Sequence, residues 1–224
     1  MRRVTMMTAA AAMLCSALHA EIVKEYFPNG KVRTETNYLD VTHTKSREGI
    51  KEGLQRAYYA GGQLAYEVTY RNDKRDGIMK WYDREGHLIE EMPYRMGKRH
   101  GVEKSYFPGG KLKHIVRYID DKKEGDEKSF YENGQLALIA HWRHNKKEGI
   151  QKEYRIDGTL LTQVRYRNNY KEGMQEWYDK AGRVTRKELY KMDRPVQLMA
   201  KIEGKKADDR ILIKGLDFSP KPAR

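Results

Sequence analysis

The sequence is poor in aliphatic residues and has no long hydrophobic run. Of its 224 residues, 38% are hydrophobic, and the mean hydropathy is −0.94. No apolar stretch approaches the roughly 20 residues that a membrane-spanning helix needs, which excludes a polytopic membrane protein. The apolar content is also too low for a thick globular core.

The sequence has a single cysteine, and no stretch of the mature chain shows helical periodicity. Cys15 is the only cysteine, and it lies within an N-terminal segment that we expect to be removed. A mature chain without cysteine has no disulfide and no thiolate to act as metal ligand or nucleophile.

Disorder is disfavoured because 16 Tyr, 4 Phe and 3 Trp accompany 19 Gly that are spread along the chain.

Residues 1–20 have the layout of a secretory signal peptide. Arg2 and Arg3 precede an apolar segment from Met6 to Leu18, and the small Ala20 stands before the charged Glu21. Leu14 precedes Cys15 where a lipoprotein signal would have a small residue, so we expect ordinary cleavage rather than lipid anchoring. The mature protein would then be periplasmic or extracellular. Loss of the two arginines lowers the net charge from +13 to +11, because the segment has no acidic residue.

The mature chain repeats with a constant period of about 24 residues, which is in the range of known repeat proteins. Positions are counted here from the first glycine of each unit, which recurs as Gly53, Gly77, Gly101, Gly125, Gly149 and Gly173. A second glycine follows at position 9, aromatic residues at positions 5 and 17, and an aliphatic residue at position 11. Six copies that agree at five positions establish a repeat protein.

An earlier, partial copy precedes these six units. Tyr26, Gly30, Val32 and Tyr38 have the spacing of the second part of the unit, with an insertion near residues 41–52. We therefore expect a repeat array over residues 21–196. Residues 197–224 would form an atypical C-terminal cap and tail, since Gln197 stands where the next glycine is due.

Each unit is predicted to form a β-hairpin. Asn133-Gly134 and Asp157-Gly158 between apolar and aromatic residues predict tight turns in which both central residues have positive φ. Seven hairpins would give about 14 strands in an all-β, elongated, single-layer antiparallel sheet, which at ~4.8 Å per strand is on the order of 65 Å long. Residues at positions 1, 5, 11, 15 and 17 are expected to share one face.

The unit resembles the variant MORN repeat of bacterial proteins of the YwqK antitoxin type. The segments Lys122-Lys123-Glu124-Gly125 and Phe130-Tyr131-Glu132-Asn133-Gly134-Gln135-Leu136 carry the resemblance, which extends over roughly residues 24–196. It implies a sheet of consecutive hairpins that serves as a binding or spacing scaffold. The antitoxin grouping also implies a partner toxin.

No motif for catalysis or metal binding is found. The sequence lacks the G-x-S-x-G, H-E-x-x-H, G-x-G-x-x-G and P-loop patterns, so an enzyme is not expected. His141 and His144 would point to opposite faces of an alternating strand, which disfavours joint coordination of a metal. We expect neither a metal nor another cofactor.

Basic residues recur at positions 3, 21 and 22. Those at positions 21 and 22 are candidates for binding an anionic lipid or glycan surface: Lys74, Arg75, Lys98, Arg99, Lys122, Lys123, Lys146 and Lys147. The alternative interpretation is a solvated edge that deters edge-to-edge pairing. Nucleic acid is not expected as a partner of an exported protein.

Positions 4 and 6 vary from unit to unit. They include the aromatic residues Trp81, Phe107, Tyr131 and Trp177, which we identify as candidates for binding a partner. The alternative is local packing against the next hairpin. The sequence thus predicts an exported, non-enzymatic β-repeat scaffold that binds a protein or envelope component, with toxin neutralisation and anionic-surface binding as alternatives.

Overall fold

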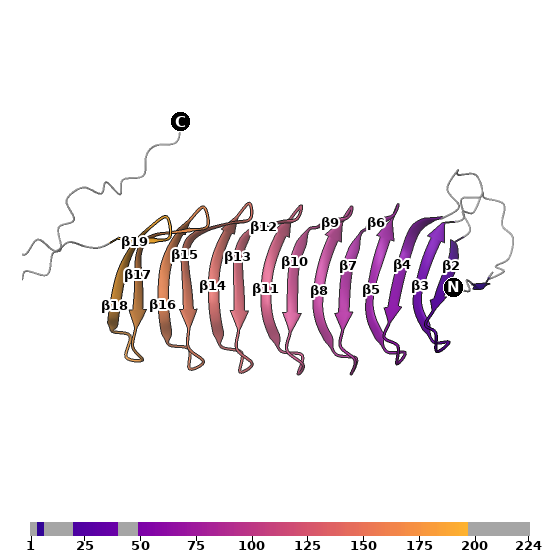
Figure 1. Ribbon diagram of the computed structural model, residues 1–224, viewed down its shortest axis with the longest axis horizontal. Helices are drawn as coiled ribbons and strands as arrows, with labels where there is room; N and C mark the ends of the chain where they lie inside the picture. The colour runs from indigo at the N-terminus through magenta and orange to yellow at the C-terminus, as the bar shows by residue number, and fades with distance from the viewer. Residues whose placement is uncertain (1–3, 7–19, 40–48, 197–224) are drawn as a thin grey trace, which may run out of the picture.

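The fold is one open antiparallel sheet that extends along a single direction. The computed structural model describes residues 4–6, 20–39 and 49–196, which form a 19-stranded sheet. Each long strand pairs with the long strands that precede and follow it in the chain, and Figure 1 shows the hairpins side by side in one layer. The predicted all-β, single-layer array of hairpins is confirmed.

Fourteen long strands form seven hairpins. They are β2 (Ala20–Tyr26), β3 (Val32–Leu39), β4 (Ile50–Tyr58), β5 (Leu64–Arg71), β7 (Gly77–Tyr82), β8 (Leu88–Arg95), β10 (Gly101–Tyr106), β11 (Leu112–Ile119), β13 (Gly125–Phe130), β14 (Leu136–Arg143), β15 (Lys146–Tyr154), β16 (Leu160–Arg167), β17 (Tyr170–Tyr178) and β18 (Val184–Lys191). Short strands follow three of the hairpins and end the array: β6 (Lys74–Arg75), β9 (Lys98–Arg99), β12 (Lys122–Lys123) and β19 (Arg194–Val196).

The N-terminal edge is covered by a short strand, β1 (Val4–Met6). It pairs with β2, with Val4 opposite Lys24, and it falls inside the segment 1–20 that the sequence predicts to be removed. Cys15, most of the insertion near residues 41–52 and the cap predicted over 197–224 lie outside the described residues. The hairpin pattern itself continues to Val196.

Two kinds of turn alternate along the chain, and the expectation for the glycine turns was wrong. At Asn133-Gly134 only the glycine has positive φ, and the Gly134 N–H donates to the Tyr131 carbonyl at 2.8 Å. Tyr131 N–H also donates to the Gln135 carbonyl, so this is a three-residue loop with a bulged glycine. A register shift in the adjoining strands, between Ser129 and Phe130, accompanies it.

The two-residue turns with two positive φ values lie at the other end of each hairpin. In Asn168-Asn169 the φ angles are 52° and 74°, and Arg167 opposes Tyr170. Asn and Asp tolerate this left-handed region better than other side-chain-bearing residues. We call the two-residue turns, at positions 19 and 20, the polar turns: 72–73, 96–97, 120–121, 144–145, 168–169 and 192–193.

Each polar turn is hydrogen-bonded to the unit before it. Asn169 donates its N–H to the Lys147 carbonyl at 3.1 Å and accepts the Lys147 N–H on its side-chain oxygen at 2.7 Å. Asp121 and Arg99 repeat this exchange at 3.0 and 2.9 Å. The carboxylate at position 23 accepts the N–H of the next turn, as Glu148 does from Asn168 at 2.9 Å. The K-[KR]-E-G segment therefore joins consecutive hairpins.

The faces of the sheet differ from the expectation that positions 1, 5, 11, 15 and 17 align. Met79 opposes Met92 and Gly77 opposes Tyr94, so positions 0, 2, 4, 13, 15 and 17 share one face. Positions 1, 3, 5, 11, 14 and 16 lie on the other. The loop length sets how the two strands of a hairpin match, and the bulge moves position 11 away from positions 15 and 17.

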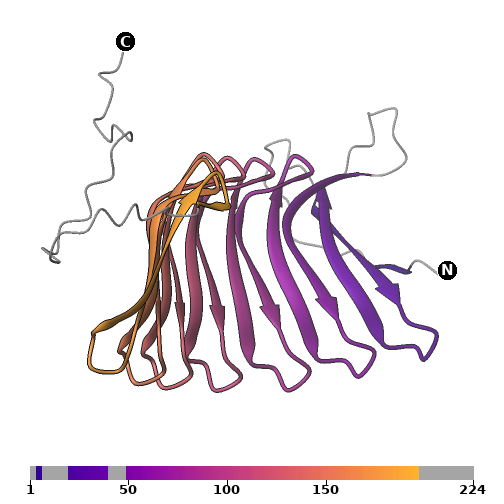
Figure 2. The ribbon, with the colours of Figure 1, turned by 60° about the vertical axis from the view of Figure 1, so that its left-hand side comes forward.

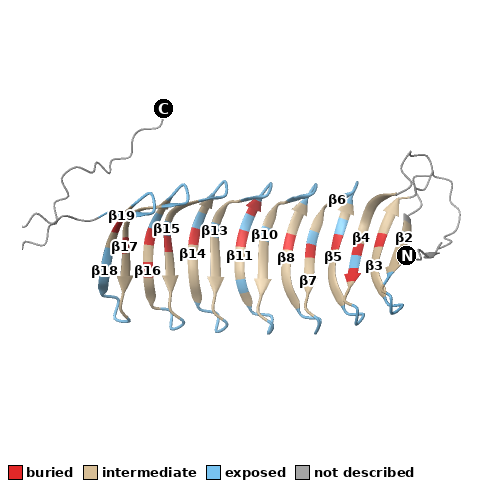
Figure 3. Cartoon of the chain, in the orientation of Figure 1, coloured by how far each residue is buried: buried red, intermediate tan, exposed pale blue. Residues whose placement is uncertain are grey.

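Burial distinguishes the two faces. Val68, Val116 and Ala140, all at position 15, are at most 1% exposed, whereas Ile78 and Ile150 at position 1 are 50% and 44% exposed. The strands bend, as Figure 2 shows, and the buried segments recur along the array in Figure 3. No second layer among the described residues covers the buried face, so the curvature and the neighbouring side chains bury it. We call it the inner face and its reverse the outer face.

Gly97 is the only second residue of a polar turn that lacks a side-chain acceptor. A Cβ there would meet the Lys74 side chain at 3.6 Å, which is ordinary contact. In Gly97→Asn we expect the new side-chain oxygen to accept the Arg75 N–H. This should raise the free energy of unfolding by about 0.5–1.5 kcal/mol. Urea unfolding followed by circular dichroism would measure this.

Gly97→Ala is the matched control, because it adds a Cβ at φ 87° without an acceptor and should destabilise the protein. Equal stability of the Asn and Ala variants would contradict the role assigned to the turn side chain.

Candidate binding surfaces

A ladder of aromatic rings and cations runs along the inner face. The ring at position 17 of each unit lies under the cation at position 22 of the preceding unit, at 4.2–5.1 Å from the ring centroid. The pairs are Lys51–Tyr70, Arg75–Tyr94, Arg99–Tyr118, Lys123–Trp142, Lys147–Tyr166 and Lys171–Tyr190. Each such contact contributes about 0.5–2 kcal/mol, depending on how far it is desolvated.

The contacts of this ladder separate the eight basic candidate residues at positions 21 and 22 into two sets. Arg75, Arg99, Lys123 and Lys147 lie half-buried on the inner face against aromatic rings. Lys74, Lys98, Lys122 and Lys146, the residues just before them, are exposed and belong to the outer face. Only this second set is free to form an anionic-surface contact on the outer face.

The exposed lysines lie beside a second basic row that the sequence reasoning missed. Position 18 pairs with position 21, as Arg71 does with Lys74 and Arg95 with Lys98. The exposed residues of this row are Arg71, Arg95, Ile119, Arg143, Arg167 and Lys191. Their recurrence once in every unit was a signal in the sequence, although Ile119 interrupts it.

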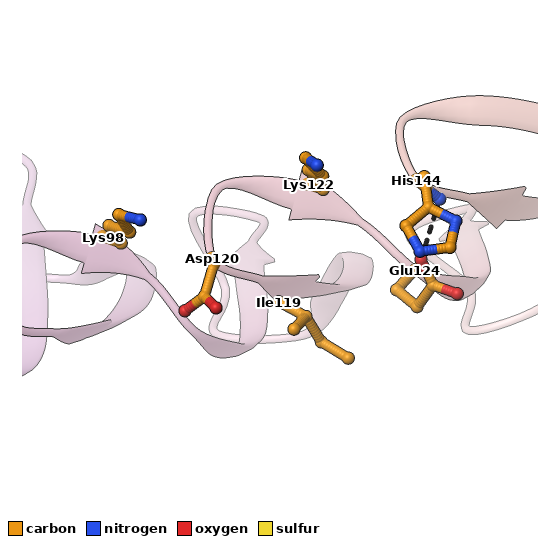
Figure 4. Close-up of a pocket in the computed structure, with 6 residues that line it drawn as sticks. All are labelled: Lys98, Ile119, Asp120, Lys122, Glu124 and His144. Atoms are coloured by element: carbon orange, nitrogen blue, oxygen red, sulfur yellow. Dashed lines mark hydrogen bonds between the residues drawn. The ribbon is translucent and has the colours of Figure 1, made fainter.

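A hollow lies where Ile119 replaces a basic residue. It has a volume of about 420 Å³ and is lined by Lys98, Ile119, Asp120, Lys122, Glu124 and His144. Figure 4 shows His144 above Glu124, whose carboxylate accepts the His144 N–H at 2.8 Å. Asp120 lies 3.6 Å from Arg95 and 3.2 Å from His100, so acidic groups partly balance the basic edge.

A polar cluster interrupts the apolar part of the inner face at its middle. Glu127 accepts hydrogen bonds from Lys123 at 2.7 Å and the Trp142 ring nitrogen at 2.6 Å, and pairs with His114 at 2.9 Å. Burial alone would raise the pKa of Glu127, but the hydrogen bonds of His114 and Lys123 lower it to about 2. Burial and the charge of Glu103 raise the pKa of Glu90, which lies opposite Ser105.

The outer face carries tyrosines bonded to carboxylates. Tyr106 donates its hydroxyl to Glu91 at 2.7 Å, and Tyr58 donates to Glu35 at 2.8 Å. Burial, followed by this hydrogen bond, raises the pKa of both tyrosines to about 12. These tyrosines at position 5 join consecutive units and are structural.

The four aromatic candidates lie in different settings. Trp81, at position 4 of the inner face, packs against the cluster of Met92, Val116 and Tyr118. Trp177, at position 4 four units further along, has Arg186 over its ring at 4.6 Å.

The two candidates at position 6 lie beside the glycine turns. Tyr131 donates its hydroxyl to the Tyr154 carbonyl at 2.7 Å, which ties it to the next unit, and Lys113 lies 5.8 Å from the Phe107 ring. The two tryptophans therefore share a face and a row, while Phe107 and Tyr131 lie apart from them.

The row that contains both tryptophans is the variable part of the inner face. It alternates position 4 of one strand with position 13 of the next, in registers such as Trp81–Glu90 and Ser105–His114. From Trp81 onward its members are Trp81, Glu90, Ser105, His114, Ser129, Leu138, Glu153, Thr162, Trp177 and Arg186. We call it the variable row.

No group of three or more potential metal ligands occurs within residues 20–39 and 49–196. His141 pairs with Asp126 at 2.9 Å on the outer face, and His144 lies in a polar turn. Within the part of the chain that the structure describes, no helix is long and apolar enough to cross a membrane.

The geometry defines the class as a single-layer β-hairpin repeat protein. A family model described as a MORN repeat variant matches residues 22–40, 51–72, 75–96, 99–120 and 123–144. The chain belongs to this family of MORN-type repeats, and two further units with the same strand registers follow Gly149 and Gly173. No curated protein matches the chain. The matched family carries no antitoxin description, so that grouping stays a prediction.

Glu127 makes the stability depend on pH. Its folded pKa of about 2 lies below its ordinary value of 4.5, so its contribution is complete above pH 4.5 and is lost as the pH falls towards 2. We expect Glu127→Gln to lower the free energy of unfolding by about 1–3 kcal/mol at pH 7 and much less near pH 2. Denaturant unfolding at a series of pH values measures this difference.

Glu132→Gln is the control, because Glu132 is exposed in a glycine turn. A loss of stability for Glu127→Gln that stayed constant from pH 7 to pH 2 would show that ionisation of Glu127 has no part in it.

Proposed function

We propose that this protein is an exported, non-enzymatic scaffold that binds a protein or envelope component along the inner face of its ribbon. The MORN-type fold supports a binding role at the level of the class. Export is supported by the sequence of residues 1–20.

The variable row carries the proposal. On the side of the row towards the polar turns, the inner face keeps a regular chemistry, with glycine at position 0, aromatic rings at position 17 and cations at position 22. The row itself changes from tryptophan to carboxylate, hydroxyl, imidazole and aliphatic side chains. Because the fold tolerates any of these, their identities are free to match a partner, and half-buried tryptophans make strong interface anchors.

The experiment uses adjacent residues of the same strand as probe and control. A photo-crosslinking amino acid is placed at Ser105 or Glu153 on the inner face, and at Lys104 or Lys152 on the outer face. All four side chains are half-buried, so the pairs differ mainly in direction. Crosslinking in cells is followed by mass spectrometry of the envelope fraction.

We expect one crosslinked partner from both inner positions, its yield falling at least fivefold with Trp177→Ala. Equal crosslinking from inner and outer positions, or no reproducible product from either inner position, would overturn the proposal. The same spectra report the mature N-terminus, which export predicts at Glu21.

A second candidate function is binding to anionic lipid through the outer face. The rows at positions 18 and 21 provide exposed cations, and exposed aliphatic residues such as Ile78 and Val102 lie on the same face. Each cation near an anionic membrane contributes about 1 kcal/mol, which salt weakens.

We expect the protein to sediment with vesicles that contain anionic lipid and not with zwitterionic ones. Replacing Arg71, Lys74, Arg95 and Lys98 together by glutamine should weaken this binding at least tenfold, since about four favourable contacts are lost. The control replaces Lys24 and Lys187, which lie on the outer face away from these two rows and pair with Glu35 and Glu176. Equal loss in both variants would reject the outer edge as the lipid-binding site.

A further inference from the structure

The inner face twice combines a tryptophan ring, a cation and a carboxylate. The two sets are Trp142 with Lys123 and Glu127, and Trp177 with Arg186 and Glu188. The cation lies 4.7 Å from the ring centroid in the first set and 4.6 Å in the second, and in both it also donates to the carboxylate. Each cation is thus held by the face of a ring and by an opposite charge together. We call these two sets the cation triads.

Trp81 and Glu90 occupy the same two row positions as a pair in the second triad. Trp81 lies directly opposite Glu90 in the pairing of β7 with β8, as Trp177 lies opposite Arg186 in the pairing of β17 with β18. Both tryptophans are half-buried on the inner face. The residue opposite the ring is therefore a carboxylate in one place and a cation in the other. A ring and a carboxylate stand together at Trp81, which are two of the three members of a cation triad.

Further aromatic and acidic groups adjoin this pair. Tyr66 lies opposite Trp81 on one side, and Ser105 lies opposite Glu90 on the other. Burial, followed by the charge of Glu103, raises the pKa of Glu90. A carboxylate in such surroundings is stabilised in its charged form by a neighbouring cation. Ser105 is also a small residue, so it covers little of the carboxylate beside it.

The inner-face cations in this part of the ribbon are engaged in contacts of their own. Arg75 and Arg99 lie over rings of the aromatic ladder, at 4.7 and 4.2 Å from the ring centroids. His114, whose charge would lower the pKa of Glu90, pairs with Glu127 at 2.9 Å. Each of these groups therefore already has an aromatic or acidic contact.

We propose that Trp81 and Glu90 bind an arginine of the partner, with its guanidinium stacked on the ring and paired with the carboxylate. This inference rests on the proposed function for the existence of the partner, and it adds that the partner is a protein whose bound segment presents an arginine at this place in the variable row. Arginine suits the site because its planar guanidinium both stacks on an aromatic face and pairs with a carboxylate. The Arg186–Trp177 contact is an example within the same chain.

The test titrates the full chain with Nα-acetyl-arginine amide and follows the three tryptophan indole N–H resonances by NMR. We expect a saturable shift of the Trp81 resonance. The Trp142 and Trp177 resonances are internal controls and should shift much less, because Lys123 and Arg186 already lie over their rings. Nα-acetyl-citrulline amide has nearly the same shape without the charge, and it should bind roughly tenfold more weakly.

Two adjacent carboxylates on opposite faces provide matched variants. Glu90→Gln should weaken binding of the arginine derivative roughly tenfold, because the ion pair is lost while the side chain keeps its size. Glu91→Gln is the control, since Glu91 lies on the outer face and accepts the Tyr106 hydroxyl at 2.7 Å. Equal binding of the arginine and citrulline derivatives, an equal effect of the two variants, or no saturable shift of the Trp81 resonance would overturn the proposal.

Crosslinking separates this inference from the proposed function. A photo-crosslinker at Glu153, further along the variable row, reports binding of the partner, and adding Glu90→Gln should lower its yield at least fivefold. An unchanged yield would overturn the arginine site and leave the inner-face scaffold standing. A chain without Glu90→Gln that gave no reproducible crosslink would overturn the scaffold, whereas the titration tests the arginine site without the partner.

Discussion

The structure depends on the bonding between one hairpin and the next. A single-layer sheet has no second layer to pack against, so each unit buries its side chains only against its neighbours. Two sets of contacts do this at every repeat. The polar turn exchanges hydrogen bonds with the backbone of the preceding unit, as Asn169 does with Lys147, and the cation of that unit lies over the next aromatic ring. Because both contacts connect positions in consecutive units, the constant length of the unit is itself the main constraint.

This arrangement explains how a basic chain with few aliphatic residues forms an ordered sheet. Part of the positive charge is neutralised or stacked inside the fold: Lys123 lies 4.7 Å from the Trp142 ring and 2.7 Å from Glu127. Other cations, such as Lys74 and Lys98, lie exposed along one edge of the outer face. The charge excess of the sequence thus has two roles, one in stability and one at the surface.

The residue types of the candidate binding surfaces could be predicted from the sequence, but the face of the sheet on which each side chain lies could not. The repeat was visible from Gly53 and its successors, and the hairpin array follows from it. The direction of each side chain depends on loop length and on the bulge beside the glycine turn, which the Asn133-Gly134 pattern did not reveal. Consequently Arg75 and Lys74, adjacent in sequence and grouped together, belong to opposite faces. Trp81 and Tyr131 were candidates for binding a partner, with local packing as the alternative, and each makes a local contact whose partner no sequence pattern reports.

The sequence by itself determined the period, the strand content, the number of hairpins and the class of protein, because these follow from residue types that recur at a constant spacing. Only the tertiary structure decided which positions share a face, where the two-residue turns lie and which cations contact aromatic rings or carboxylates. Those properties depend on register between strands and on contacts between units, and a shift of a single residue in register moves every side chain of a strand to the other face.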